Sequence, residues 1–308
     1  MSTSIGLSVV IPVYNSESIL PELINRLEKS LQDEAQEFEI ILVNDGSLDK
    51  SWNQIRELAR THRRVRGIDL MRNYGQHNAL LCGIRSARYN ITVTMDDDLQ
   101  HPPEEIPKLI NKLAEGYDVV YGTPIKEQHG FWRDFGSRIT KLSMQNIVGI
   151  DTASKVGSFR VFRTNLREAF ASYQSAFISI DVLLTWGTTR FASVPVNHQA
   201  RLVGTSNYNF RKLIIHTLNM ITGFSILPLR VASLVGFCFT FFGLFVLIYV
   251  IGSYLIRGGE VPGFAFLASI ILIFSGAQLF SLGIIGEYLA RMHFRLMAKP
   301  VYIKREEI

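Results

Sequence analysis

Two uncharged runs of 26 residues each, at 231–256 and 261–286, limit the possible folds of this chain more than any other feature. A helix needs about 20 apolar residues to cross the hydrocarbon core of a bilayer. Only Arg257-Gly-Gly-Glu260 separates the two runs. Two buried helices of a soluble core are the alternative, but such helices rarely stay uncharged over this length. The sequence therefore predicts a transmembrane hairpin within 230–290.

The charges that flank this hairpin predict its orientation. The connecting loop carries one Arg and one Glu, whereas both outer flanks are basic. Basic residues near membrane spans favour the cytoplasmic side. Both termini, the preceding domain and a basic tail at 291–308 are therefore expected in the cytoplasm. The flanking basic residues are Arg211, Lys212 and Arg230 before the first run, and Arg291, Arg295, Lys299, Lys304 and Arg305 after the second.

Residues 1–208 alternate short β-rich runs with polar, helix-like stretches. This alternation predicts an α/β domain with a mostly parallel sheet covered by helices on both faces. Strands are expected at 7–14, 38–43, 65–70, 91–95 and 118–122, and helices at 17–31, 51–61, 78–87 and 107–115.

The stretch 209–229 is intermediate in character, because it mixes Lys212, His216 and Asn219 with many apolar residues. It suits helices in the membrane interface, and equally an amphipathic helix packed on the soluble domain. The net charge is +5, with dispersed Lys and Arg and no basic run interleaved with aromatic residues. A nucleic-acid partner is therefore disfavoured, and a membrane surface suits this charge better.

Three consecutive carboxylates, Asp96, Asp97 and Asp98, follow the apolar strand expected at 91–95. Like charges this close repel one another, and a divalent cation would relieve the repulsion. The carboxyl end of a strand is also where open α/β sheets bind ligands. The alternative is a solvated acidic turn at the start of the next helix, which the following Pro and Glu residues also fit.

Polar residues follow three other expected strands. Pro12, Tyr14 and Asn15 end the first strand, and Asp45 follows the second. The polar loop 72–77 follows the third. Each feature alone fits an ordinary turn or a helix cap. Their recurrence after successive strands of a parallel sheet predicts one binding site at a common edge.

With these motifs the chain resembles the family 2 glycosyltransferases of the GT-A fold, and more narrowly those that use polyprenyl phosphate. That group includes dolichyl-phosphate mannose synthases, bactoprenol glucosyltransferases and undecaprenyl-phosphate aminoarabinose transferases. The resemblance covers nearly the whole chain. Its carriers are Val9-Val-Ile-Pro-Val-Tyr-Asn, Val43-Asn-Asp-Gly-Ser, Arg72-Asn-Tyr-Gly, Asp96-Asp-Asp-Leu-Gln-His-Pro-Pro-Glu, Gly204-Thr-Ser-Asn-Tyr and Gly283-Ile-Ile-Gly-Glu-Tyr-Leu-Ala-Arg.

The resemblance implies roles for individual residues on the donor side. The nucleotide would be bound by Pro12, Tyr14, Asn15 and Glu17, with Asp45 at the base and Asp96 near the nucleoside and sugar. Asp97, the variable middle residue of the motif, would also belong to the nucleotide site. Asp98 and Gln100 would hold Mg²⁺ or Mn²⁺ beside the diphosphate. Asp96, Asp98 and Arg201 would be the catalytic residues, and His101 would shape the loop.

On the acceptor side, the resemblance implies a polyprenyl (undecaprenyl) phosphate in the cell inner membrane. Its phosphate would be contacted by Arg133, Arg138, Arg201, Ser206 and Arg211. The alternative for each Arg is a solvated surface charge. A UDP-sugar is the favoured donor, and assembly through the hairpin, with a tetramer as one form, is expected.

A phosphate monoester has a second pKa near 6 and is mostly dianionic at neutral pH, so it needs little help from a general base. Its in-line attack would invert the anomeric carbon. Some relatives carry an Asp where this chain has Ser158. Either no base is needed, or turnover is slow, or Asp97 or Asp181 assists. Asp151 lies seven residues upstream. Arg160 could contact the donor or support its loop.

The sequence disfavours two other functions. A processive polysaccharide synthase would carry a Gln-x-x-Arg-Trp motif and further spans, because two helices cannot enclose a polar polymer path. A non-catalytic membrane scaffold that kept the fold would be expected to have lost the acid triplet, which is intact here.

Overall fold

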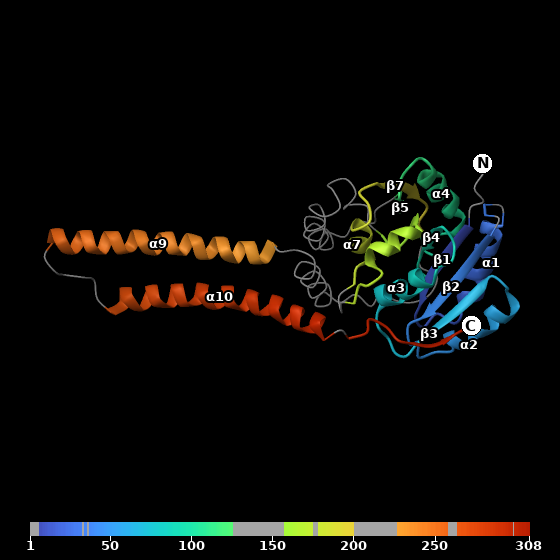
Figure 1. Ribbon diagram of the computed structural model, residues 1–308, viewed down its shortest axis with the longest axis horizontal. Helices are drawn as coiled ribbons and strands as arrows, with labels where there is room; N and C mark the ends of the chain where they lie inside the picture. The colour runs from blue at the N-terminus through green and yellow to red at the C-terminus, as the bar shows by residue number, and fades with distance from the viewer. Residues whose placement is uncertain are drawn as a thin grey trace. The chain divides into compact units, whose positions relative to one another are not determined.

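The computed structural model describes residues 6–32, 34–35, 37–125, 157–174, 178–199, 227–257, 264–297 and 299–308. The chain divides into two compact units. The first is Met1–Phe210 together with Ala298–Ile308, and the second is Arg211–Met297. Figure 1 labels the elements of both units.

The first unit is built on one eight-stranded sheet with the order β7-β5-β6-β4-β1-β2-β3-β8. Neighbouring strands are parallel from β4 through β1 and β2 to β3, and again between β5 and β7. Strands β6 and β8 are antiparallel to their neighbours. The bounds are β1 Gly6–Val13, β2 Glu37–Asn44, β3 Val65–Leu70, β4 Ile91–Thr94, β5 Val119–Pro124, β6 Arg160–Arg163, β7 Phe191–Val196 and β8 Lys304–Glu307.

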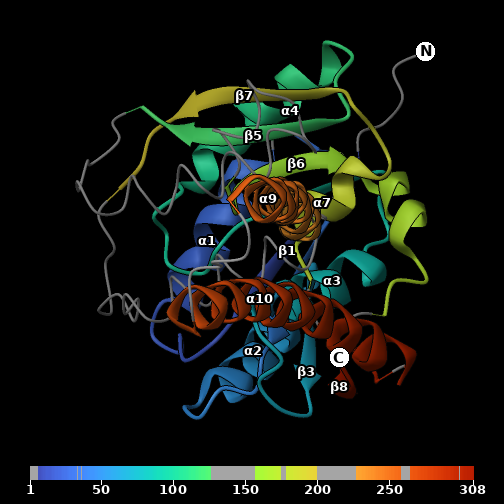
Figure 2. The same cartoon turned by 90° about the vertical axis from the view of Figure 1, so that its left-hand side faces the viewer.

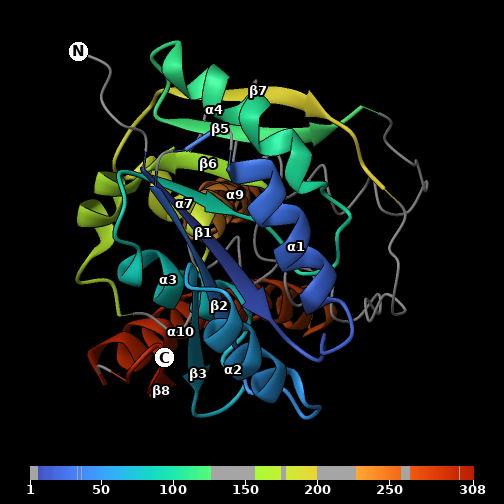
Figure 3. The same cartoon turned by 90° about the vertical axis from the view of Figure 1, so that its right-hand side faces the viewer.

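Helices cover both faces of this sheet. On one face, α1, α2 and α4 lie over the sheet, as Figure 3 shows. Their apolar side chains form one core cluster with residues of β1 and β2 and, around α4, of β5, β6 and β7. On the other face, where Figure 2 labels α3 and α7, the helices α3, η2 and α7 form a second core cluster with residues of β1, β2, β3, β5 and β6. The bounds are α1 Leu20–Leu31, α2 Ser51–Thr61, α3 Gln76–Ser86, η1 Pro103–Glu105, α4 Ile106–Ala114, η2 Thr164–Phe170 and α7 Ile180–Thr185.

The predicted fold class is confirmed, and the five expected strands correspond to β1 to β5. The sequence did not indicate the other three strands. Strand β8 reads Lys-Arg-Glu-Glu, so it has no apolar alternation to detect. Charged residues are common on edge strands, where they discourage pairing with other chains. The segment 291–308, expected as a basic tail, thus contributes the last strand of the sheet.

The second unit contains two long helices, α9 Leu227–Arg257 and α10 Phe264–Leu296. The stretches Pro228–Ser253 and Ile273–Leu296 are long and apolar enough to cross a membrane, and their most apolar parts have no buried residue. A helix from a soluble core would be mostly buried, so these helices indicate membrane association. Helix α10 continues ten residues past 286, with an ion pair of 2.7 Å between Arg291 and Glu287.

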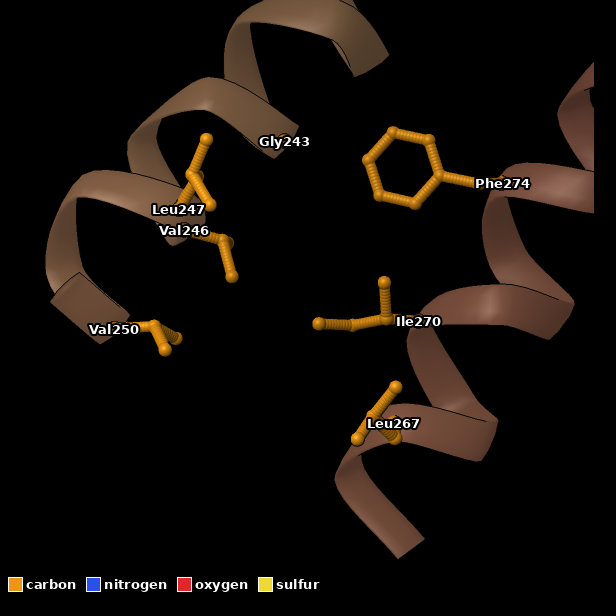
Figure 4. Close-up of a pocket in the computed structure, with 7 residues that line it drawn as sticks. All are labelled: Gly243, Val246, Leu247, Val250, Leu267, Ile270 and Phe274. Carbon is orange, nitrogen blue, oxygen red and sulfur yellow. The ribbon is translucent and has the colours of Figure 1, made fainter. Parts of the chain in front are cut away.

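The two long helices enclose an apolar groove of about 350 Å³. Figure 4 shows side chains of both helices pointing into it. A Cβ added at Gly243 would lie 2.8 Å from the ring of Phe274, so the helices approach closely at this point. The lining residues are Gly243, Val246, Leu247, Val250, Leu267, Ile270 and Phe274.

Helix α3 approaches the sheet closely at Gly83. A Cβ added there would lie 2.3 Å from Cγ1 of Val10 and 3.1 Å from Cγ2 of Val43. Those side chains belong to β1 and β2, which carry two of the site loops described below. The missing side chain at 83 therefore sets how near α3 lies to the strands of the site.

Gly83→Ala is expected to lower the free energy of unfolding by about 1–3 kcal/mol, because the added methyl overpacks a close contact. Thermal or denaturant unfolding of the purified protein measures this. Asn53→Ala, at an exposed position of α2, is the matched control and should leave stability within about 0.5 kcal/mol. An unchanged stability for Gly83→Ala would show that the sheet gives way at this contact.

Candidate active site

The loops that follow β4, β1, β2 and β3 meet at one edge of the sheet, because these four strands are parallel neighbours. They enclose a polar pocket of about 260 Å³. Six of the predicted site residues line it together with four that the sequence did not assign. The six are Pro12, Tyr14, Asp45, Asp96, Asp97 and Asp98, and the four are Val13, Asn73, Gly75 and Gln76.

Asp45 ties the loop after β2 to the loop after β3. Its Oδ1 accepts a hydrogen bond from the amide of Tyr74 at 2.7 Å, and its Oδ2 accepts one from the amide of Gly75 at 2.8 Å. Burial raises the pKa of Asp45, although the two amides oppose this shift. Both oxygens already have partners, so any contact with a nucleotide base would be made in addition to these bonds.

Asn15 and Glu17 hold the loop after β2 and do not line the pocket. The Asn15 side chain accepts a hydrogen bond from the amide of Leu48 at 2.8 Å, and Glu17 accepts one from the amide of Lys50, also at 2.8 Å. Asn15 has a φ of 55°, in the left-handed region that Asn tolerates better than most residues. Both side chains thus support the loop after β2, and their contact with a nucleotide stays a prediction.

Each carboxylate of the acid triplet has a different environment. Asp96 accepts hydrogen bonds from Nε2 of Gln76 at 2.6 Å and from Oγ of Ser158 at 2.7 Å. Asp97 accepts one from the amide of Tyr14 at 3.3 Å. Asp98 accepts one from the amide of Gln100 at 3.1 Å. The triplet is therefore held in place by the loop after β1, by Gln76 at the start of α3, by Ser158 and by the backbone of the loop that contains it.

Burial raises the pKa of Asp97 to about 6, and the neighbouring charges of Asp96 and Asp98 add to the shift. The concentration of negative charge that the sequence predicts is thus present at the pocket. No group of three His, Cys, Asp or Glu side chains placed to hold a metal ion occurs among the described residues. A cation bound here would need oxygens from another molecule as well as from Asp98 and the side chain of Gln100.

A buried ion pair lies beneath Asp96. Arg160, which is 1 % exposed, pairs with Asp181 and donates to Oγ1 of Thr94 at 2.8 Å. Thr94 donates in turn to the carbonyl of Ser158 at 2.9 Å. Asp181 also accepts a hydrogen bond from the hydroxyl of Tyr121 at 3.1 Å. Arg160 therefore supports the segment that contains Ser158, and Asp181 is bound within this buried network by Arg160 and Tyr121.

The segment after β7 contacts the loop that holds the acid triplet. The amide of Gln199 donates to the carbonyl of Gln100 at 2.9 Å, and Asn197 donates to Glu105 at 2.9 Å. The ring of His101 lies 5.0 Å from that of His198 and stacks on Phe159 at 5.2 Å. Burial lowers the pKa of His101 to about 4, so this ring is neutral and packs as part of the loop.

The residues predicted to contact the acceptor lie outside the described part of the chain, as do Asp151 and the segment 209–226. The predicted acceptor residues are Arg133, Arg138, Arg201, Ser206 and Arg211. Of the pocket residues that were missed, Asn73, Gly75 and Gln76 belong to the polar loop 72–77. The sequence marked that loop as a strand end, but nothing in it indicated which side chains point inward.

The sequence profile of glycosyl transferase family 2 matches residues 8–170, which include most of β1, all of β2 to β6 and the acid triplet. The chain belongs to this family. The protein is therefore a glycosyltransferase, and the pocket at the ends of β1 to β4 is its candidate active site.

Relatives of this glycosyltransferase match along nearly its whole length. An undecaprenyl-phosphate 4-deoxy-4-formamido-L-arabinose transferase of Pseudomonas aeruginosa is 36 % identical over 95 % of this chain and 87 % of its own. The protein of the same name from Shewanella sediminis is 36 % identical over 96 % and 90 %. Glucosyl-3-phosphoglycerate synthase of Mycobacterium tuberculosis has a similar fold, with a TM-score of 0.50 and 16 % identity over 70 % and 78 % of the two chains.

Asp45→Asn is expected to weaken the pocket, because an amide NH₂ group would face one of the two backbone N–H donors. The expected loss of stability is about 1–3 kcal/mol, with weaker nucleotide binding. Thermal unfolding measures the loss of stability, and calorimetric titration with a nucleoside diphosphate measures the change in nucleotide affinity.

Asp118→Asn is the matched control for this change. Asp118 accepts from Arg163 and Thr188 and does not line the pocket. Its replacement should lower stability but leave nucleotide affinity unchanged. Equal affinities for Asp45→Asn and the unaltered protein would show that the amides of the loop after β3 need no such acceptor.

Proposed function

We propose that this glycosyltransferase transfers a sugar from a nucleotide sugar, a UDP-sugar in the first place, to undecaprenyl phosphate at the cytoplasmic face of the inner membrane. The observation that carries the proposal is the acid triplet, intact and lining a pocket with the loops of three other strands. Relatives named undecaprenyl-phosphate sugar transferases, which match over more than nine-tenths of the chain, support the acceptor.

The donor set suits a hard divalent cation, Mg²⁺ or Mn²⁺. Mg²⁺ is usually bound by one or two carboxylates together with substrate phosphates and not by an all-protein cage. The described residues fit this pattern, because Asp98 lines the pocket and no three-ligand cluster occurs among them. Gln100 is the second ligand in this proposal; its amide donates to Asp98, but it is not among the residues that line the pocket. When bound, the cation would neutralise the negative charge that develops on the leaving diphosphate.

The residues of the chain would act mainly by position. Pro12, Tyr14 and the loop held by Asp45 would line the nucleotide, while Asn15 and Glu17 keep that loop in place. Asp96 would sit at the sugar, fixed by Gln76 and Ser158. An oxygen of the lipid phosphate would attack the anomeric carbon in line and expel the nucleoside diphosphate with inversion. Positioning of this kind lowers the barrier without a covalent step on the protein.

The acceptor phosphate would be bound by Arg201, Ser206 and further Arg residues at 133, 138 and 211. Guanidinium groups bind phosphate through paired, charge-assisted hydrogen bonds. The segment after β7, which leads to Arg201, is hydrogen-bonded to the loop that holds the acid triplet, from the amide of Gln199 to the carbonyl of Gln100. This contact would bring the acceptor residues toward the donor.

Two crossings of the membrane would return the chain to the side on which it began. Pairing of β8 with β3 supports this arrangement, because the segment after α10 joins the sheet that precedes α9. The basic flanks then favour the cytoplasm for both termini and for the catalytic domain. Association of several copies through α9 and α10, with a tetramer as one form, stays a prediction.

The deciding experiment measures transfer of labelled sugar from UDP- and GDP-sugars to undecaprenyl phosphate, with Mg²⁺ or Mn²⁺ and with EDTA. The panel includes UDP-glucose and the UDP-linked formamido-arabinose. We expect a lipid-soluble product only with metal, and a loss of at least about 100-fold in Asp98→Ala. Glu57→Ala, an exposed acid of α2, should keep full activity. A folded protein that gives no lipid product with any donor would instead support the scaffold hypothesis.

Ser158 tests whether a general base is needed. Ser158→Ala removes one hydrogen bond to Asp96 and should lower kcat by about tenfold or less. Ser158→Asp places a second carboxylate against Asp96, and we expect a larger loss because the two charges repel. Steady-state kinetics of both variants measure this. Faster turnover in Ser158→Asp than in the unaltered enzyme would mean that a base limits the reaction.

A further inference from the structure

Strand β8 brings the segment that follows the membrane helices back to the edge of the catalytic sheet. It pairs antiparallel with β3, with Ile68 opposite Glu307 and Leu70 opposite Lys304. Gly67 and Ile308 exchange two further backbone hydrogen bonds of 3.0 and 2.9 Å. The end of β3, where the pocket loop begins, is therefore in contact with residues 303–308.

Met71, the first residue of that loop, has both of its backbone polar groups bound by this segment. Its amide donates to the carbonyl of Ile303 at 3.0 Å, and its carbonyl accepts from Nη2 of Arg305 at 2.9 Å. Three residues further on, the amides of Tyr74 and Gly75 bind Asp45. The loop is thus fastened at one end by Arg305 and at the other by Asp45.

Arg305 also reaches the loop after β2 through a buried carboxylate. Its Nη1 donates to Oδ2 of Asp69 at 3.2 Å, and Oδ1 of Asp69 accepts from Nδ2 of Asn44 at 2.7 Å. Asp69 is 1 % exposed. Asn44 immediately precedes Asp45 and accepts from the amide of Ser47 at 3.4 Å. One guanidinium therefore contacts the starts of two pocket loops, directly and through Asp69.

The loops after β2 and β3 pack against each other through their backbones at Gly46. A Cβ added at Gly46 would lie 2.5 Å from the backbone of both Arg72 and Asn73. Gly46 has a φ of 63°, which favours glycine. A shift of the loop after β3 would therefore move the loop after β2 as well.

We propose that Arg305 is a positioning residue of the nucleotide site. In this proposal Ile303 and Arg305, which follow both long helices in the sequence, fix the start of the loop after β3 that lines the donor pocket. This inference rests on the proposed function for the identity of the ligand. Arg305 does not line the pocket and would not contact the nucleotide. Its side chain stays 57 % exposed, and it acts by fixing Met71 and Asp69.

The neighbouring charges of β8 provide controls, because they bind other parts of the domain. Glu306 pairs with Arg56 of α2, and Glu307 pairs with Arg66 at 2.7 Å. Neither pair contacts the pocket loops. If β8 served only to cover the sheet edge, then loss of Glu306 or of Arg305 should have similar consequences.

The test compares the full-length protein with Arg305→Ala, Arg305→Lys and Glu306→Ala, using UDP with Mn²⁺ as the probe. We expect Arg305→Ala to raise the Kd for UDP about five- to twentyfold, as for the loss of charge-assisted hydrogen bonds. The KM for the donor should rise similarly, with kcat and the KM for lipid phosphate unchanged. Arg305→Lys should recover part of the affinity, since an ammonium lacks the two-pronged geometry. Glu306→Ala should bind UDP within about twofold of the unaltered protein.

Amide hydrogen exchange of the peptide containing residues 71–76 tests the same inference without nucleotide. Arg305→Ala should exchange faster there, and Glu306→Ala should not. Equal UDP affinity in all variants, or equal changes in Arg305→Ala and Glu306→Ala, would overturn the inference. Absence of UDP binding by the unaltered protein would contradict the proposed donor, while the exchange data would still decide whether Arg305 fixes the loop.

Discussion

The parallel pairing of β4, β1, β2 and β3 is the constraint on which the site depends. Parallel neighbours end at the same edge, so the loops that follow them meet in space although Tyr14 and Asp97, for example, lie 83 residues apart in the chain. Apolar side chains on both faces of β1 and β2 hold this arrangement through α1, α2 and α3. Gly83 allows α3 to come close enough for the start of that helix to contribute Gln76.

The acid triplet shows how a cluster of like charges is kept in a folded domain. Asp96 has two hydrogen-bond donors, and the buried pair of Arg160 and Asp181 fixes the segment that supplies one of them. Removing one partner of such a pair would leave an uncompensated buried charge, so the pair is costly to break. Ser158 donates to Asp96 and adds no further negative charge to the site.

The two long helices, which indicate membrane association, interrupt the sequence of the domain that carries the pocket. The sheet of the first unit combines strands from before and after the two long helices in the sequence, since β1 to β7 precede α9 and β8 follows α10. The domain that holds the donor pocket is therefore complete only after the second helix. Arg305 provides a direct contact between β8 and the pocket loops, because it binds Met71, the first residue of the loop after β3.

Much of the architecture could be predicted from the sequence. Alternating strands and helices identified the α/β domain, and the length of the uncharged runs identified the long helices. Strand ends identified Pro12, Tyr14, Asp45 and the acid triplet, because in a parallel sheet these positions share an edge. The pocket roles of Asn73 and Gln76 escaped prediction, since the direction of a loop side chain depends on contacts with other loops.

The sequence by itself determined the fold class, through periodicity and run length, and indicated the family, through the motifs that resemble it. Only the tertiary structure decided that Asn15 and Glu17 support a loop, that Arg160 pairs with Asp181, and that Lys304–Glu307 is a strand. Each of these depends on a partner distant in sequence. A charged segment such as β8 has no apolar pattern of its own, so its conformation is set by the edge of the sheet with which it pairs.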